Sequence, residues 1–424
     1  MKRFLTSVLL LSSSSLLAGS KTDARLAEIL QFLQPNEPIV AWVFFTDKGS
    51  QEIYKSAVPR SVVSPRSFLR RLKARPAESA VDYTDLPVEQ RYVEQLASHV
   101  ISIRQTSKWF NGASVRATKE QLAQIETLPF VRSIELLARF KRDRIEEQPE
   151  ISTPLSTQKS ALGSVTNFDY GLSFGQLNQI NVPAVHNMGN YGQGVIIGSF
   201  DNGFRLLNHE AFDTLRTRIV ATYDFVDNKE SVVPNNPDPS FGSHGIVTLS
   251  ALAGFKPGEL IGPAFGASFI LARTENDSSE TPIEEDYWVA AIEWADSIGV
   301  DVTSTSLGYL TYDPPYTSWT WEDMDGNTTV ITRAADMAVS KGIVVCNSAG
   351  NNGFNASRNT LNAPADGDSV LSIGAVNSDG SRTSFSSVGP TTSNPPRIKP
   401  DVMAQGSNVR CASATDPPRT GRGD

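Results

Sequence analysis

Short apolar strands alternate with helical stretches along this 424-residue chain from Gly192 onward, and this alternation constrains its fold more than any other feature. Strand–helix alternation is typical of a parallel, doubly wound sheet with helices packed on its faces. In such sheets, reactive side chains collect beyond the carboxyl ends of the strands. The expected strands are residues 195–200, 269–273, 301–304, 343–346 and 370–376, and the expected helices are residues 244–253, 284–297 and 328–341. We therefore predict an α/β domain whose functional groups lie along one edge of its sheet.

A smaller α+β domain is predicted in front of it, over residues 21–145. Ser64 and Pro65 have the residue types of a helix N-cap and a first helical position, which predicts a helix over 64–72. Further strands are expected at 41–45, 100–104, 112–117 and 131–137, and a second helix at 119–128. Residues 146–165 are polar and lack periodicity, so we expect an exposed linker of the kind in which proteolytic cuts concentrate.

The first 20 residues have the three parts of a secretory signal peptide. Lys2 and Arg3 form a basic head, an apolar and hydroxylated run follows, and small residues end the segment. A buried helix or a membrane anchor is the alternative, but four consecutive serines interrupt a run that would need about 20 apolar residues to span a bilayer. We therefore expect export to an extracellular or periplasmic space. Cys346 and Cys411 could pair there, although two buried free thiols explain them equally well.

Composition excludes several classes of function. The chain carries 38 basic and 46 acidic side chains, a net charge of −8, which argues against a nucleic-acid partner. Two cysteines cannot form a four-cysteine zinc site, and no His/Glu cluster of the H-E-x-x-H kind is present, so we expect no metal and no cofactor. The acidic run at 284–286 fits the first turn of a helix better than a calcium site. No segment after the N-terminus is apolar enough to suggest a membrane span.

Three motifs carry residues suited to catalysis. Asp201 ends the first expected strand, His244 opens the first expected helix, and Asn351 lies in a glycine-bounded turn after the fourth strand. An amide held in such a turn can donate to a developing oxyanion. Each motif alone also fits a plain structural role, namely a strand-end turn, a surface histidine and an Asn-rich turn.

Together the motifs resemble one family, the subtilisin-like serine proteases or subtilases. The resemblance spans about residues 192–405 and rests on the order Asp, His, Asn along a parallel sheet, with further matches at 363–376 and 385–404. It implies a subtilisin-like doubly wound parallel sheet, and it makes the domain in front look like an inhibitory propeptide, bound in cis to the peptidase domain.

The same resemblance implies a role for each residue. His244 would be the general base, and Asp201 would hold its tautomer and stabilise the imidazolium. Asn351, rather than Asn352, would donate to the oxyanion. The residues that would bind the substrate backbone by strand addition are Ser306, Leu307 and Gly308.

The chain departs from the subtilase pattern at several positions. Asn202 stands where Thr or Ser is usual, Ile246 where Thr is usual, and Thr248 where an aliphatic residue is common. We expect these changes to loosen the helix that carries His244 while leaving both charged partners present.

The nucleophile block, G-T-S-x-A-x-P in form, is the larger departure, because neither Ser407 nor Ser413 has a Gly-Thr-Ser context. We therefore expect a peptidase domain over 166–424 that is incomplete at its C-terminal end, through truncation or a frameshift, and whose sheet is partly uncovered. The leading hypothesis is a secreted endopeptidase precursor, acting on protein or peptide substrates through an acyl-enzyme but inactive as written. The alternative is a pseudoprotease, a non-catalytic module that binds peptides at 306–308.

Overall fold

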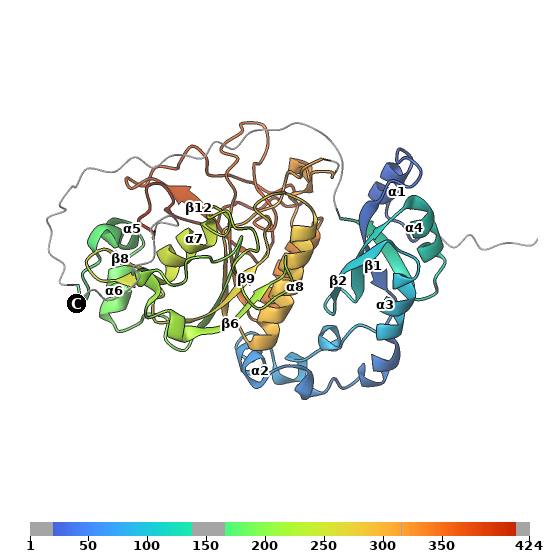
Figure 1. Ribbon diagram of the computed structural model, residues 1–424, viewed down its shortest axis with the longest axis horizontal. Helices are drawn as coiled ribbons and strands as arrows, with labels where there is room; N and C mark the ends of the chain where they lie inside the picture. The colour runs from blue at the N-terminus through green and yellow to red at the C-terminus, as the bar shows by residue number, and fades with distance from the viewer. Residues whose placement is uncertain (1–19, 138–165, 315, 413–424) are drawn as a thin grey trace, which may run out of the picture.

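Two sheet-based domains lie side by side in the computed structural model, which describes residues 20–137, 166–314 and 316–412 (Figure 1). All but the last residue of the expected signal peptide at 1–20, the expected linker at 146–165, and Ser413 lie outside the described residues. Within the described ranges, no helix combines the length and the apolar character that crossing a membrane would require.

The N-terminal domain is built on a four-stranded antiparallel sheet in the order β2-β3-β1-β4. Its strands are β1 (Ile39–Phe45), β2 (Ser102–Ser107), β3 (Gly112–Ala117) and β4 (Val131–Leu136), and its helices are α1 (Ala24–Leu30), α2 (Pro65–Arg71), α3 (Gln90–Ala97) and α4 (Lys119–Glu126). The predicted α2 is confirmed, because Pro65 occupies its first turn and the Ser64 side chain accepts a hydrogen bond from the backbone N–H of Ser67. β2 begins two residues later than expected.

Strand β1 is buried along its whole length because both faces of its sheet are covered. Side chains alternate across a strand. Val43 and Phe45 therefore enter the core of the N-terminal domain, whereas Trp42 and Phe44 point to the opposite face and join a core that includes residues of the C-terminal domain.

The C-terminal domain contains a seven-stranded sheet in the order β13-β12-β11-β10-β5-β9-β6, and every neighbouring pair is parallel. The strands are β5 (Ile196–Asp201), β6 (Ile219–Asp224), β9 (Ser268–Arg273), β10 (Val302–Thr305), β11 (Val344–Ser348), β12 (Leu371–Val376) and β13 (Val402–Gln405). The predicted doubly wound α/β class is confirmed. β6 and β13 were not predicted; they are the two edge strands of the sheet, and each has several solvent-accessible side chains.

Three longer helices pack on this sheet, namely α7 (His244–Ala253), α8 (Ile283–Ile298) and α9 (Val330–Ser340). Ile270 and Ala272 of β9 lie in the core with α8 and α9, whereas Phe269 and Leu271 lie in the core with α7. α7 therefore covers one face of the sheet, and α8 and α9 cover the other. Shorter elements complete the domain: α5 (Phe174–Gln179), α6 (Val182–Asn187), β7 (Phe255–Lys256) and β8 (Leu260–Ile261).

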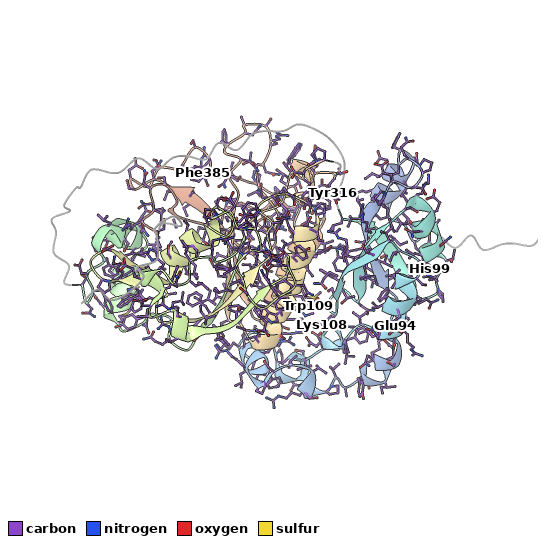
Figure 2. The ribbon with its side chains drawn as sticks, viewed as in Figure 1. Glu94, His99, Lys108, Trp109, Tyr316 and Phe385 are labelled. Carbon is purple, nitrogen blue, oxygen red and sulfur yellow. The ribbon has the colours of Figure 1, made fainter. Side chains whose placement is uncertain are left out.

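Helix α8 lies between the two sheets (Figure 1). Trp42 and Trp109 of the N-terminal domain share a core with Trp288 and Ile292 of α8. Figure 2 shows Trp109 on this interface, while His99 lies on the far side of the N-terminal domain. At the same interface, Glu293 of α8 accepts hydrogen bonds from the Ser107 hydroxyl and from the backbone N–H groups of residues 108 and 109.

Helix α2 makes a second contact between the domains. It lies at the end of α8, apart from its own sheet (Figure 1). The fully buried guanidinium of Arg71 bridges Asp85 of its own domain at 2.7 and 2.8 Å and Asp296 of α8 at 2.6 Å. Lys341, just after α9, donates to Asp85 at 2.9 Å, and Arg70 also contacts Asp296. The N-terminal domain is therefore attached through an apolar core at α8 and a buried ionic cluster at α2, and further ion pairs such as Glu135–Arg333 also join the domains.

Candidate active site

Asp201 and His244 meet at the carboxyl edge of the parallel sheet. Asp201 is the last residue of β5 and is 1% exposed, and His244 is the first residue of α7. Nδ1 of His244 lies 2.7 Å from Oδ1 of Asp201. Because an ionised carboxylate can only accept, Nδ1 carries the proton and Nε2 is left as the basic nitrogen. The charge of Asp201 raises the pKa of His244, with a further contribution from Asp277, and desolvation opposes both.

The close approach of α7 to the end of β5 depends on Gly245. A Cβ atom at this position would lie 2.1 Å from the carbonyl oxygen of Gly203, so only glycine fits. The backbone N–H of Gly245 donates to Oδ1 of Asn202 at 3.0 Å, and the Asn202 amide in turn donates to Asp277.

Two of the departures from the subtilase pattern thus form bonds in the site. Asn202 ties the strand end to the start of α7, and the Thr248 hydroxyl donates to Oδ2 of Asp201 at 2.9 Å. Ile246 is fully buried in the core beneath α7. Each of the three residues therefore contacts its surroundings, and the expected loosening of the helix stays a prediction.

Asn351 lies at the same edge of the sheet, in the turn that follows β11. Its side chain is exposed, and no hydrogen bond within the described residues holds it. The neighbouring Asn352 amide, in contrast, donates to the carbonyl of Thr360 at 3.2 Å and to the side chain of Asn362. Of the two amides, that of Asn351 is the one available to an external group.

The segment Ser306, Leu307 and Gly308 follows β10, which lies between β5 and β11 in the sheet. Its inward carbonyls are held by side-chain amides: Asn347 Nδ2 donates to Leu307 at 2.9 Å, and Asn362 Nδ2 donates to Gly308 at 3.4 Å. Ser306 is exposed. Two consecutive carbonyls of the segment are thus held by side chains of the same domain.

A cavity of about 460 Å³ adjoins this segment and His244. Its wall consists of His244, Asn202, Leu307, Asp313 and the loop 275–280. The acidic side of this cavity was not predicted. The loop 275–280 follows the carboxyl end of β9. Reactive side chains collect beyond the carboxyl ends of parallel strands, so considering β9 as well as β5 would have indicated this acidic loop.

Carboxylate oxygens of Glu275, Glu280 and Glu284 lie within 4.8 Å of one another beside this cavity, and such oxygens are suitable ligands for a hard cation. Burial raises the pKa of Glu284 to about 8 and raises that of Glu275 as well. Glu284 also lies in the first turn of α8, as the acidic run at 284–286 predicts.

The described residues place no serine hydroxyl in a hydrogen bond with Nε2 of His244. Ser407 is engaged elsewhere, since its hydroxyl donates to Oδ1 of Asn377 at 2.7 Å. Cys346 and Cys411 are not bonded to each other, which answers the question their sequence positions left open. Desolvation raises the pKa of both thiols.

Comparison with known families and proteins gives two matches along the chain. Residues 192–423 match the family described as "Subtilase family", and residues 40–152 match "Peptidase S8 propeptide domain, Bacteroidota". Together they cover most of both domains of the structure.

Individual relatives match somewhat more than half of the chain. Subtilisin NAT of Bacillus subtilis subsp. natto is 31% identical over 241 residues, 57% of this chain and 53% of its own length. Subtilisin of Bacillus pumilus is 31% identical over 241 residues, 57% of this chain and 73% of its own length. Serine protease AprX of Bacillus subtilis (strain 168) is 28% identical over 234 residues, 51% and 47% of the two chains. The chain therefore spans about half the length of several of the relatives it matches.

Proposed function

Because the chain belongs to the subtilase family, we propose that it is the precursor form of an exported serine endopeptidase acting on protein and peptide substrates. The observation that carries the proposal is the pair formed by Asp201 and His244, with its 2.7 Å hydrogen bond at the carboxyl edge of a parallel sheet. This arrangement leaves a basic imidazole nitrogen on a half-exposed side chain that lines the cavity, which suits a general base.

The proposed chemistry is acyl transfer. Nε2 of His244 accepts the proton of a serine hydroxyl while the serine oxygen attacks the scissile carbonyl, and it then returns that proton to the departing amine. Asp201 stabilises the imidazolium that forms in between. Asn351 donates to the oxyanion, an interaction worth about 10²–10³ in rate. The substrate backbone pairs with residues 306–308, which brings its carbonyl to the serine.

The sequence of 424 residues contains no Gly-Thr-Ser tripeptide, and we propose that the chain as written has no nucleophile. A serine-directed fluorophosphonate tests this: we expect no labelling of the purified chain, and stoichiometric labelling that depends on His244 would refute it. A chimera that joins residues 1–405 to the serine segment of subtilisin from Bacillus pumilus tests the parent activity. It should label and cleave casein, whereas the same chimera carrying D201N should lose most of both. Failure of a folded chimera to cleave would count against the endopeptidase assignment.

The N-terminal domain is proposed to be an inhibitory propeptide that stays bound in cis until the chain is cut within residues 146–165. Its support is the extensive contact with α8 together with the propeptide-family match over 40–152. The measurement is inhibition of a complete subtilase by residues 21–150 added in trans; no inhibition at micromolar concentration would contradict the proposal.

A pseudoprotease that binds peptides without cutting them is the second candidate. The position of Leu307 on the wall of the cavity beside His244 favours it, because backbone at such a place can pair with an added peptide strand. This candidate predicts that the 424-residue chain is monodisperse, melts in one cooperative transition and binds peptides at 306–308. A purified chain that aggregates or unfolds without a cooperative transition would count against this candidate.

Export is proposed from the basic and apolar character of residues 1–20. The expected result is a chain recovered outside the cytoplasm with a new N-terminus near Ser20. A full-length chain that stays in the cytoplasm with Met1 intact would contradict this.

A further inference from the structure

Thr248 lies one helical turn after His244 on α7, and residues four apart on a helix share a face. Its hydroxyl oxygen is 2.9 Å from Oδ2 of Asp201. The other oxygen of that carboxylate, Oδ1, accepts from Nδ1 of His244 at 2.7 Å and from the backbone N–H of Asn202 at 2.8 Å. In the parts of the chain that the structure describes, Thr248 is the one donor to Oδ2.

The hydroxyl of Thr248 has a choice of acceptors. It has a single hydrogen, and the carbonyl oxygen of Gly245 is also within reach, at 3.3 Å. The carboxylate of Asp201 is both closer and charged, and hydrogen bonds to charged acceptors are the stronger kind. The hydroxyl therefore donates to Asp201.

The Asn202 side chain does not supply this bond. Its carbonyl oxygen accepts from the N–H of Gly245, and its amide donates to Asp277. Without Thr248, Oδ2 would be a carboxylate oxygen on a residue that is 1% exposed, with no protein donor. An unsatisfied buried oxygen of this kind is costly, so the carboxylate would rotate away from its present plane to find a partner.

We propose that Thr248 is a positioning residue of the catalytic pair, and that its hydroxyl holds the plane of the Asp201 carboxylate so that Oδ1 faces Nδ1 of His244. The inference rests on the proposed function of that pair. Its chemical consequence is a fixed tautomer: with Oδ1 in place, the proton stays on Nδ1 and Nε2 remains basic. A helix residue thus orients a carboxylate that sits on a strand.

Histidine NMR on the whole 424-residue chain tests this, because the chain has only four histidines and no proteolytic activity is needed. With ¹⁵N-labelled histidine, the readouts are the Nδ1–H resonance of His244 and the pH midpoint of its ring nitrogens. The D201N variant gives the reference change in the pKa of His244. It removes the carboxylate that raises this pKa most and leaves the second one, Asp277.

The variants compared are T248V, which removes the hydroxyl at similar size, and T248S, which restores it. T303V is the matched control, because Thr303 is fully buried on β10 and its hydroxyl has no hydrogen-bond partner within the described residues. We expect T248V to broaden or lose the Nδ1–H resonance and to lower the pKa of His244 by less than D201N does. T248S and T303V should match the wild type.

Unchanged signals of the other three histidines, His99, His186 and His209, show that a variant is folded. If T248V fails this check, T248A serves in its place, since alanine favours the helix and also lacks the hydroxyl. A folded T248V or T248A with the wild-type resonance and midpoint would overturn the role of Thr248 alone. A D201N variant with the wild-type midpoint would instead overturn the pair itself, and the proposed function with it.

Discussion

Asp296 is the centre of the ionic contact between α2 and α8, and replacing it by Asn tests how the N-terminal domain is held. Asp296 is fully buried, and its two oxygens contact Arg70 and Arg71, whose side chains are 2% and 0% exposed. Asn keeps the shape but removes the charge and turns an NH₂ group toward one of the arginines. Breaking a buried ion pair from one side costs about 3–5 kcal/mol, because the remaining charge stays buried without its partner.

The lower end of that range applies here. Arg71 keeps its two bonds to Asp85, and Arg70 keeps its bonds to the carbonyls of Val300 at 2.8 Å and Lys341 at 3.2 Å. We therefore expect D296N to weaken the attachment of α2 by about 3 kcal/mol, or about 150-fold in its equilibrium constant.

Hydrogen–deuterium exchange of the full chain measures this attachment. Amides of α2 and of the last turn of α8 should exchange faster in D296N, while those of β1 and β3 keep their protection. The matched control is E135Q. Glu135 also pairs across the interface, with Arg333 at 3.0 Å, but both side chains are about a third exposed, so the change should cost less than about 1 kcal/mol. If D296N and E135Q exchanged alike, the ionic contact would not hold the domain and the reasoning would fail.

Two other positions, Glu285 and Gly245, have measurable consequences for stability. Burial raises the pKa of Glu285 from 4.5 to about 7, so the folded state binds this proton more tightly than the unfolded state. The group therefore stabilises the fold fully below about pH 4.5 and loses that contribution as the pH rises through about 7. In urea unfolding, E285Q should flatten the dependence of the unfolding free energy on pH between these values. An unchanged dependence would contradict the assignment. G245A should cost about 1–3 kcal/mol because its new Cβ meets the carbonyl of Gly203, whereas G175A, with open space around its Cβ, should be neutral or slightly stabilising in the same melts.

The pattern of the sequence singled out Asp201 and His244, which the structure brings together, because each residue sits where a local rule applies. Asp201 ends a buried strand, and His244 opens a helix whose observed bounds are the predicted ones. Such rules depend on near neighbours in the chain. α9, in contrast, is shorter than predicted because Thr329 caps it rather than lying inside it.

Features that depend on distant pairs were not predictable in this way. Arg71 and Asp296 are 225 positions apart, and nothing in either local sequence indicates the other. The edge strands β6 and β13 each contain only three consecutive apolar residues, and their pairing with β9 and β12 depends on distant parts of the chain. Thr248 appeared as a mismatch because its partner, Asp201, lies 47 positions earlier and becomes its neighbour only once α7 docks on β5.

The placement of Trp42 and Phe44 at the interface makes separation of the two domains hard to reverse. These side chains and Trp109 are covered only while the N-terminal domain contacts α8 and its neighbours. If the chain were cut between the domains and they separated, the sheet of the N-terminal domain would expose these aromatic side chains to water. Exposure costs about 25 cal/mol for each Å² of apolar surface. The departing domain would have lost the cover over one face of its sheet, and proteolysis of unfolded chains is irreversible. Rebinding would then compete with degradation, so a separation that begins as an equilibrium would end as a one-way step.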